Sequence, residues 1–256
     1  MLPSIYWLRI RNQLKPILTL SIVSHGQGSL VGQLLSDIDL LDFSHFELVN
    51  LIVTVNIPED ESFLEGYLDK VVVLRNPRPL GFGANHNQAF SAMKSNFFAV
   101  LNPDLRISQS FSEHISNAKN LNWGCMAPIV YSTEGKIEDS ARRYPSVLRI
   151  SKRVFFNQRD SDYVLPLNEK YLEVEWLAGM FLLFRSEIYR ALQGFDDSFF
   201  MYLEDADICR RANRAGFPVL LNSNFSVVHD ARRNSFKDSR HLVWHIRSMI
   251  RFIFRL

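Results

Sequence analysis

The sequence lacks the features that would place this chain outside the ordinary globular proteins. It has only two cysteines, Cys125 and Cys209, and their spacing matches neither a disulfide framework nor a zinc site. That usage favours a reducing cytoplasm. No low-complexity tract, internal repeat or linker rich in proline, glycine or serine interrupts the 256 residues. The 47% apolar content is enough for a sizeable core, so we expect one domain.

Long apolar runs and a strong charge of one sign are also absent. The longest apolar runs are short, such as WLAGMFLLF at 176–184, whereas a membrane-spanning helix needs about 20 such residues. The N-terminal segment has its basic residues after the apolar ones, which is the wrong order for a signal peptide. The net charge is only +2, but both ends of the chain are basic. We therefore expect no transmembrane segment and no signal peptide.

The pattern of apolar segments predicts alternating strands and helices over the first half. Strands are expected at 16–26, 46–56, 71–77, 97–104 and 123–131, and helices at 29–41, 83–95 and 109–120. Such alternation predicts an α/β fold with a mostly parallel sheet covered on both faces. Ligands of these sheets bind beyond the carboxyl ends of the strands. The polar residues expected there are Ser24, His25, Asn56, Arg75, Asn76, Asn102 and Asp104.

The second half is less regular and contains one strongly patterned stretch. Residues 173–200 predict a strand, a helix and a turn, and FFMYLEDADICRRANRAG at 199–216 predicts a further helix that ends at Gly216. Its acids lie in the first turn and its arginines in the last, which complements the helix dipole. This electrostatic explanation accounts for the acids without any catalytic role.

Three short motifs have both a functional and a structural interpretation. Asp104, in LNPDLRI, could hold a divalent cation, but Asn-Pro-Asp also forms ordinary turns. The loop LGFGANHN at 80–87 could present a helix N-terminus to an anion, although it lacks the third glycine of a dinucleotide fingerprint and the Gly-Lys-Ser/Thr of a P-loop. His229 ends a predicted strand, where a single histidine is more often structural. His241 and His245 lack the glutamate of a zinc motif and are expected on the surface.

The C-terminal SRHLVWHIRSMIRFIFRL has two interpretations of equal weight. Arg247, Arg251 and Arg255 recur every four residues among bulky apolar side chains. Such a helix can lie in a membrane interface, or it can pack on the domain with a solvated arginine edge. Nucleic-acid binding is not expected, because the arginines alternate with large aliphatic residues.

Taken in order, the motifs resemble a known family. SIVSHG, RNPRPLGFGANHNQA, LNPD, SARRYP, EVEWLAGMFLLFR and GFDDSFFMYLEDADICRR, followed by a strand ending in histidine, are similar to the family 2 glycosyltransferases of the GT-A fold. The bacterial rhamnosyltransferases that build cell-surface polysaccharides are the most similar members. The resemblance spans about 17–235. It implies a single domain over 1–256, with a nucleotide-binding half at 16–131, an acceptor and catalytic half at 132–235, and a basic helix at 236–256.

The resemblance also implies roles for individual residues. Asp104 and His229 match the residues that hold Mg²⁺ or Mn²⁺, and Asp205 matches the general base of an inverting transfer. Glu204 is its neighbour or the alternative base, and Asp207 is expected to be structural. The donor loop and sugar pocket match Gly81, Phe82, Asn85, Asn87, Trp176 and Gly179.

Two segments depart from the family pattern. Val55 stands where an aspartate that reads the nucleotide base is usual, and Ser24–His25–Gly26 stands where Asn-Tyr-Asn is common. Glu59 or Asp60 could replace the missing acid. The resemblance therefore leaves the nucleotide and the sugar open.

The expected function follows from the resemblance. It is metal-dependent inverting transfer of a sugar, with L-rhamnose from a dTDP donor as the candidate, to a polyprenyl-diphosphate-linked glycan at an anionic membrane surface. The resemblance implies a cytoplasmic protein peripheral to the inner face of the cell membrane, and a homodimer is compatible with it. One alternative is a degenerate protein that only binds a glycan or a partner. Another is a nucleotidyltransferase, which is disfavoured because SIVSHGQGSL has no lysine or arginine.

Overall fold

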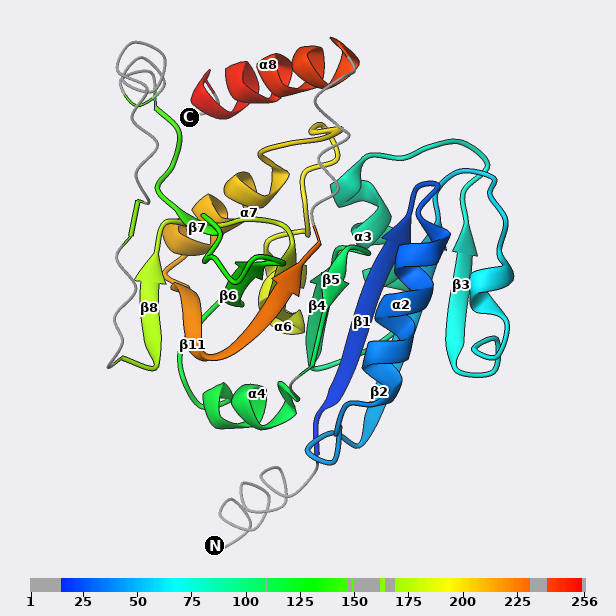
Figure 1. The fold of residues 1–256 in the computed structure, drawn as a ribbon. Helices are drawn as coiled ribbons and strands as arrows, with labels where there is room; N and C mark the ends of the chain where they lie inside the picture. Colours follow the sequence, from blue (N-terminus) through cyan, green and yellow to red (C-terminus); the bar gives the residue numbers. More distant parts are fainter. Residues whose placement is uncertain are drawn as a thin grey trace, which may run out of the picture.

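The computed structural model describes residues 15–108, 110–146, 149, 162–163, 169–230 and 239–254. The first half forms four parallel strands in the order β3-β2-β1-β4, and β4 joins them to the second half of the sheet (Figure 1). Their bounds are β1 Ile17–Ser24, β2 Leu48–Val55, β3 Val71–Arg75 and β4 Phe97–Leu101. These strands lie at the positions that the apolar runs predict, and Pro103 follows the end of β4 where extension would require a backbone N–H.

The second half of the sheet is mixed. Strand β10 (Phe181–Arg185) runs antiparallel to β4 and also to β6 (Cys125–Ser132), whereas β6 is parallel to β11 (Val219–His229). Two short strands, β5 (Leu105–Arg106) and β8 (Tyr171–Val174), pair antiparallel with β11. The α/β class is confirmed, and the parallel arrangement is confined to β1–β4 and the β6–β11 pair. A separate two-stranded sheet joins β7 (Ala141–Arg142) to β9 (Trp176–Leu177).

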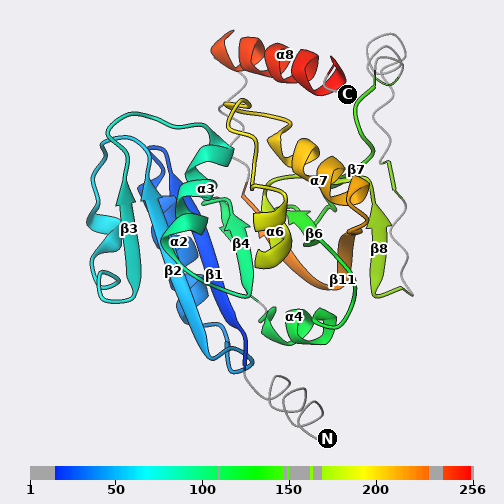
Figure 2. The same cartoon turned by 180° about the vertical axis from the view of Figure 1, so that it is seen from behind.

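Helices cover both faces of the large sheet (Figures 1 and 2). The apolar sides of α2 (Gly28–Asp39) and α4 (Ser112–Ala118) belong to one core cluster. The other face carries α3, α6 and α7, and Phe252 of α8 joins the same cluster. Their bounds are α3 Phe82–Ala92, α6 Ser186–Ala191, α7 Glu204–Arg214 and α8 Ser239–Phe254, and a short 3-10 turn η1 spans Ser62–Leu64.

Several expectations can be compared directly with these elements. The helix expected at 109–120 is shorter, and the helix expected at 83–95 ends at Ala92. Cys125 and Cys209 are buried and free. Among the described helices, none is long and apolar enough to cross a membrane. His245 is exposed, as expected, whereas His241 is half-buried and its Nδ1 lies 2.8 Å from the Tyr202 hydroxyl.

Candidate active site

The predicted donor loop is fixed by a buried cluster of asparagines at the carboxyl end of β2. Asn76 donates to the Asn56 Oδ1 at 2.9 Å and to the Asn85 Oδ1 at 2.6 Å. The Asn56 Oδ1 also accepts from the Leu80 N–H at 2.8 Å, and the Asn85 amide donates to the Gly81 carbonyl at 2.9 Å. Asn56 and Asn85 therefore hold the shape of residues 76–82. Asn76 joins them, a connection that the motif alone does not reveal.

Gly81 and Phe82 join this loop to the segment that precedes α7. The Phe82 N–H donates to the Phe200 carbonyl at 3.0 Å, and a Cβ on Gly81 would lie 2.5 Å from that same oxygen. Only glycine allows this approach. The Phe82 ring in turn lies beside Gly179, where an added Cβ would meet it at 3.3 Å. The predicted donor loop thus contacts both the 200–203 segment and Gly179, which is predicted to belong to the sugar pocket.

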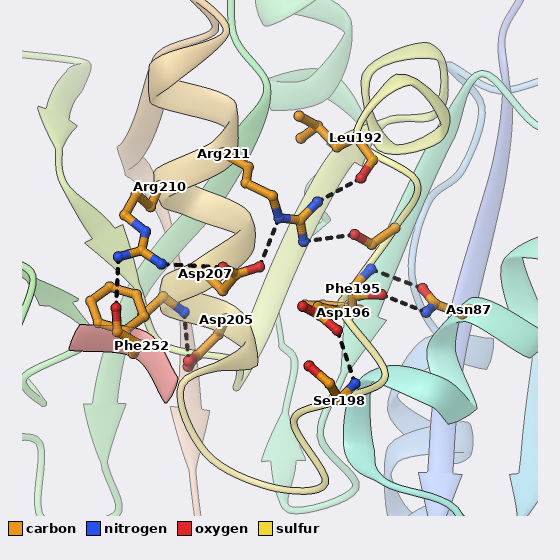
Figure 3. Close-up of polar contacts among 12 residues, drawn as sticks. Asn87, Leu192, Phe195, Asp196, Ser198, Asp205, Asp207, Arg210, Arg211 and Phe252 are labelled. Atoms are coloured by element: carbon orange, nitrogen blue, oxygen red, sulfur yellow. Dashed lines mark hydrogen bonds and ion pairs between the residues drawn. The ribbon is translucent and has the colours of Figure 1, made fainter. Parts of the chain in front are cut away.

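Asn87 uses its amide within the fold (Figure 3). Its Oδ1 accepts from the Phe195 N–H at 2.9 Å and from the Tyr189 hydroxyl at 2.6 Å. Its Nδ2 donates to the Phe195 carbonyl at 2.8 Å and to the Asp197 Oδ1 at 2.7 Å. Because these contacts occupy both ends of the side-chain amide, we assign Asn87 to support of the 194–198 turn. A direct donor contact is a prediction that this geometry does not favour.

The chain enters α7 through two residues in the left-handed region. Tyr202 has φ 73° and Leu203 has φ 65°, which is strained backbone for side chains of this size. The strained turn places Asp205 against Gly179: the Gly179 N–H donates to Oδ2 at 2.8 Å, and the Ala206 N–H donates to Oδ1 at 2.8 Å. Asp205 is therefore held by backbone groups from two separate segments, so its carboxylate has a fixed orientation.

The two neighbouring acids of α7 differ in environment. Burial raises the pKa of Asp205, against the hydrogen bonds from the Ala206 and Gly179 N–H groups and the charge of Arg142. Burial raises the pKa of Glu204 well above its usual range, and the adjacent Asp205 carboxylate raises it further. The Glu204 Oε2 is buried and has no hydrogen-bond partner within the described residues. We infer that Glu204 keeps its proton while Asp205 ionises, which is the state that a general base requires.

Asp207 supports the helix, as the sequence predicts (Figure 3). Its side chain is 2% exposed and accepts from the Arg211 Nε at 2.7 Å, with Arg210 at 3.5 Å. Arg211 also donates to the carbonyls of Leu192 and Gly194 at 2.6 and 2.8 Å. This network fixes α7 against the turn at Gly194.

The two predicted metal ligands meet where β5 pairs with the end of β11. The His229 Nε2 lies 3.2 Å from the Asp104 Oδ2, and its Nδ1 lies 2.8 Å from the Glu138 Oε2. Although burial lowers the pKa of His229, Asp104 and Glu138 raise it to about 9. Glu138 orients the imidazole in the manner typical of outer-shell carboxylates at metal sites. Sequence reasoning missed Glu138, because only the folded chain brings it to His229.

Asp104 and His229 fit a divalent cation. The Asp104 Oδ1 is buried and unpaired among the described residues, so one hard oxygen is available beside an imidazole nitrogen. The described part of the chain contains no cluster of three or more acidic, histidine or cysteine side chains that could hold a metal by themselves. If these two described residues held the ion, water and substrate oxygens would supply its other ligands, which is how Mg²⁺ commonly binds nucleotides.

Other predicted residues are distributed around this centre. Asn102 donates its N–H to the Met180 carbonyl at 2.9 Å, which brings it next to Gly179. The guanidinium of Arg142, on β7, lies 5.1 Å from the ring of the buried Trp176. The sequence motif SARRYP includes Arg142, but the contact with Trp176 depends on the pairing of β7 with β9.

Glu59 lies at the end of β1, in the region expected to bind the nucleotide base. Glu59 accepts from the Gly26 N–H at 3.2 Å and from the Gly28 N–H at 3.0 Å, beside a cavity of about 430 Å³. Ser24 is buried behind it, and the exposed His25 contacts the Asn56 amide at 3.1 Å. Glu59, one of the two expected substitutes for the missing acid, thus lies at the end of β1.

Arg75 is separate from this region. Its guanidinium forms an exposed ion pair with Glu61 at 2.6 Å, so the structure does not bring it to the centre of the site.

Comparison with known proteins gives a consistent picture. Residues 16–245 match the family described as glycosyltransferase-like family 2. Rhamnosyltransferase WbbL of Escherichia coli K12 is 26% identical over 251 residues, which cover 91% of each chain. An N-acetylglucosaminyl-diphospho-decaprenol L-rhamnosyltransferase of Mycobacterium tuberculosis H37Rv is 27% identical over 165 residues, or 60% of this chain. The match covers 53% of that relative, about half its length.

Solved structures share the fold at low sequence identity. GalNAc-T7 with UDP, GalNAc and Mn²⁺ superimposes with a TM-score of 0.67 at 14% identity, over 93% of this chain and 48% of that one. The mannosyltransferase PcManGT of Pyrobaculum calidifontis, in complex with GDP-Man and Mn²⁺, gives 0.62 at 14% identity, over 96% and 71%. The α/β sheet described above is therefore a GT-A fold.

Proposed function

Because this chain belongs to glycosyltransferase family 2 and is a glycosyltransferase of polysaccharide biosynthesis, we propose that it transfers L-rhamnose from a dTDP donor to a lipid-linked glycan. The observation that carries the reaction type is the position of Asp205, fixed by the Gly179 and Ala206 N–H groups beside the predicted sugar pocket. The choice of rhamnose and of the acceptor follows the names of two relatives, one of which acts on a diphospho-decaprenol glycan.

The proposed step is a single displacement. Asp205 accepts the proton of an acceptor hydroxyl while that oxygen forms a bond to the anomeric carbon of the donor sugar. The bond between that carbon and the diphosphate oxygen breaks, and the nucleoside diphosphate leaves with the electron pair. Asp104 and His229 would hold the Mg²⁺ or Mn²⁺ whose charge balances this leaving group. The protonated Glu204 stays neutral beside the base and so avoids two adjacent buried charges.

The donor is tested by thermal stability of the purified chain with dTDP, UDP, GDP and their sugar conjugates, with and without Mn²⁺. A ligand that binds only the native state at about 100 times its Kd adds roughly 2.7 kcal/mol, which raises the Tm of a chain of this size by several degrees. We expect that shift with dTDP-L-rhamnose and Mn²⁺. A Tm shift with another nucleotide instead would replace dTDP as the assigned nucleotide of the donor. No shift with any would favour the binding-only alternative.

We also propose that α8 docks the enzyme on an anionic membrane surface. Leu242, Ile246 and Phe254 form a stripe on the outward face of α8 and are 63%, 50% and 76% exposed. The opposite face packs on the domain, where the Phe252 carbonyl accepts from Arg210 at 2.9 Å. The packing interpretation therefore describes the inner face of this helix, and we propose the membrane-interface interpretation for its outward face. An apolar stripe beside arginines suits an interfacial helix.

Substituting Leu242, Ile246 and Phe254 by Ser is expected to lower co-sedimentation with phosphatidylglycerol-containing vesicles at least tenfold, because each exposed side chain would otherwise bury apolar surface in the interface. The Tm should be unchanged, since the three side chains contact solvent. Leu40 and Leu68, 86% and 64% exposed on other elements, provide the matched control when changed to Ser. Equal loss in the control, or no loss in the α8 variant, would contradict docking through α8.

A further inference from the structure

We propose that the cavity between α8 and the segment before α7 binds the diphosphate of the lipid-linked acceptor through Arg247 and Arg251. The cavity has a volume of about 620 Å³, and its lining includes Ser198, Phe200 and Trp244 together with these two arginines. That volume is typical of a small-molecule site. The identity of the ligand rests on the proposed function, because it takes the acceptor to be a polyprenyl diphosphate glycan.

The charge of the cavity is unbalanced. The described residues that line it include no carboxylate. Within the described residues, neither Arg247 nor Arg251 forms an ion pair with an acid, and the Arg251 guanidinium lies over the Phe199 ring at 5.7 Å. Arg210 and Arg211 differ, because the buried Asp207 balances them on α7. Two guanidinium groups at a concave surface, without an acidic partner among the described residues, favour an anion, and their planar donors match phosphate oxygens.

The position of the cavity suits the reaction. Its wall at Ser198 and Phe200 belongs to the short segment that leads to Glu204 and Asp205. That segment is fixed on one side by the donor loop through the Phe200 carbonyl and on the other by α8, where the Ser248 hydroxyl donates to the Met201 carbonyl at 2.8 Å. In an acceptor of the glycosyl-diphospho-lipid class, the diphosphate is attached to the glycan that receives the sugar. A diphosphate in this cavity therefore lies on the segment that carries the base.

The apolar surroundings indicate a lipid source for the phosphate. The Trp244 and Phe200 rings lie 4.9 Å apart at the cavity, and the outward face of the same helix exposes Leu242 and Ile246. A polyprenyl chain leaving the cavity would meet this apolar face and the membrane beside it. A free phosphate ligand would gain nothing from that arrangement.

The test is binding of farnesyl diphosphate to the full chain by calorimetry, without divalent ions so that the donor site does not take up the diphosphate. We expect the double variant R247Q/R251Q to weaken Kd at least tenfold, since each arginine loses charge-assisted hydrogen bonds. Arg240→Gln removes the same charge from the same helix outside the cavity lining and should change Kd less than twofold. R247K/R251K, which keeps the charge, should lie between wild type and the double variant. A Tm measurement on each variant confirms folding.

Two further probes separate the outcomes. Inorganic diphosphate that binds as tightly as farnesyl diphosphate would overturn the lipid assignment, and farnesol that binds as tightly would overturn the role of the diphosphate. Equal binding by wild type and R247Q/R251Q, or equal weakening by Arg240→Gln, would overturn the site while leaving transfer by the wild type unaffected. If the wild type binds farnesyl diphosphate through both arginines but transfers no sugar to any diphospho-lipid acceptor, the proposed function fails and the lipid diphosphate site stands.

Discussion

Asp205→Asn is expected to lower kcat for sugar transfer by about 10²–10⁴-fold, the usual contribution of a general base. An amide has no basic oxygen to accept the acceptor proton. The measurement is the steady-state rate with the donor that the nucleotide panel identifies. Donor affinity, measured as the metal-dependent Tm shift, should remain, because Asp205 acts on the acceptor. In the wild type, both Asp205 oxygens accept a backbone N–H, one from Gly179 and one from Ala206. The asparagine side chain would place an NH₂ group, which cannot accept, against one of these donors. We therefore expect a modest loss of stability.

Glu204→Gln is the matched control for this substitution. Burial and the adjacent Asp205 raise the pKa of Glu204 well above its usual range, and Gln is close in shape and charge to the protonated Glu that we infer. We expect kcat within a few-fold of wild type. The opposite pattern, an inactive Glu204→Gln and an active Asp205→Asn, would make Glu204 the base.

The pH profile provides a second check on Asp205. Since burial raises the pKa of Asp205, the rate should fall with decreasing pH already above the usual aspartate range. The base works only when ionised, so activity is present above that pKa and lost below it. An acid limb at the ordinary carboxyl pKa would contradict a base whose pKa is raised.

The sequence was sufficient for the parallel half of the sheet because each of its strands is a local apolar run. The runs that become β1 and β4 are almost wholly buried, β2 is buried over its second half, and the edge strand β3 is buried only at Val71. The helices between them have one apolar side. The same reasoning finds the apolar segment 176–184 but not its partners. Insertion of β10 between β4 and β6 depends on contacts between residues far apart in the chain, such as Phe181 with Leu101. The spacing of apolar residues along the chain does not indicate which strands β10 will pair with.

The site residues likewise fall into those that a sequence motif identifies and those that only tertiary contacts reveal. Asp104, Asp205 and His229 stand out because a motif marks each of them, and the fold places Asp104 and His229 in contact. Glu138 has no motif, and its role appears only when β11 brings His229 beside it. Asn87 lies in a motif that suggests the donor, yet its amide contacts Phe195, 108 residues away in the chain. A motif identifies a residue, whereas its partners depend on tertiary packing.

Asp104→Asn is expected to abolish the metal-dependent part of donor binding and to lower kcat/KM by about 10²–10³-fold, since metal stabilisation of the leaving charge contributes several kcal/mol. The amide keeps the size of the side chain but removes the negative charge and one oxygen ligand. The reason for choosing this carboxylate is its Oδ1, which is buried beside His229 and has no protein partner within the described residues. Adding EDTA to the wild type should give the same loss.

Glu138→Gln tests whether Glu138 orients His229, in contrast to Asp104, which is predicted to bind the metal itself. Glu138 contacts the His229 Nδ1 at 2.8 Å and not the predicted cation position between His229 and Asp104, so it should affect metal affinity only by orienting the imidazole. The expected loss is about 10–100-fold in the Mn²⁺ concentration needed for half-maximal activity, with full activity recovered at high Mn²⁺. Recovery in Glu138→Gln and none in Asp104→Asn would distinguish the two roles. A metal-dependent Tm shift that survives in Asp104→Asn would instead mean that the cation is held elsewhere, because Asp104 is the only carboxylate among the two described residues that we predict to bind it.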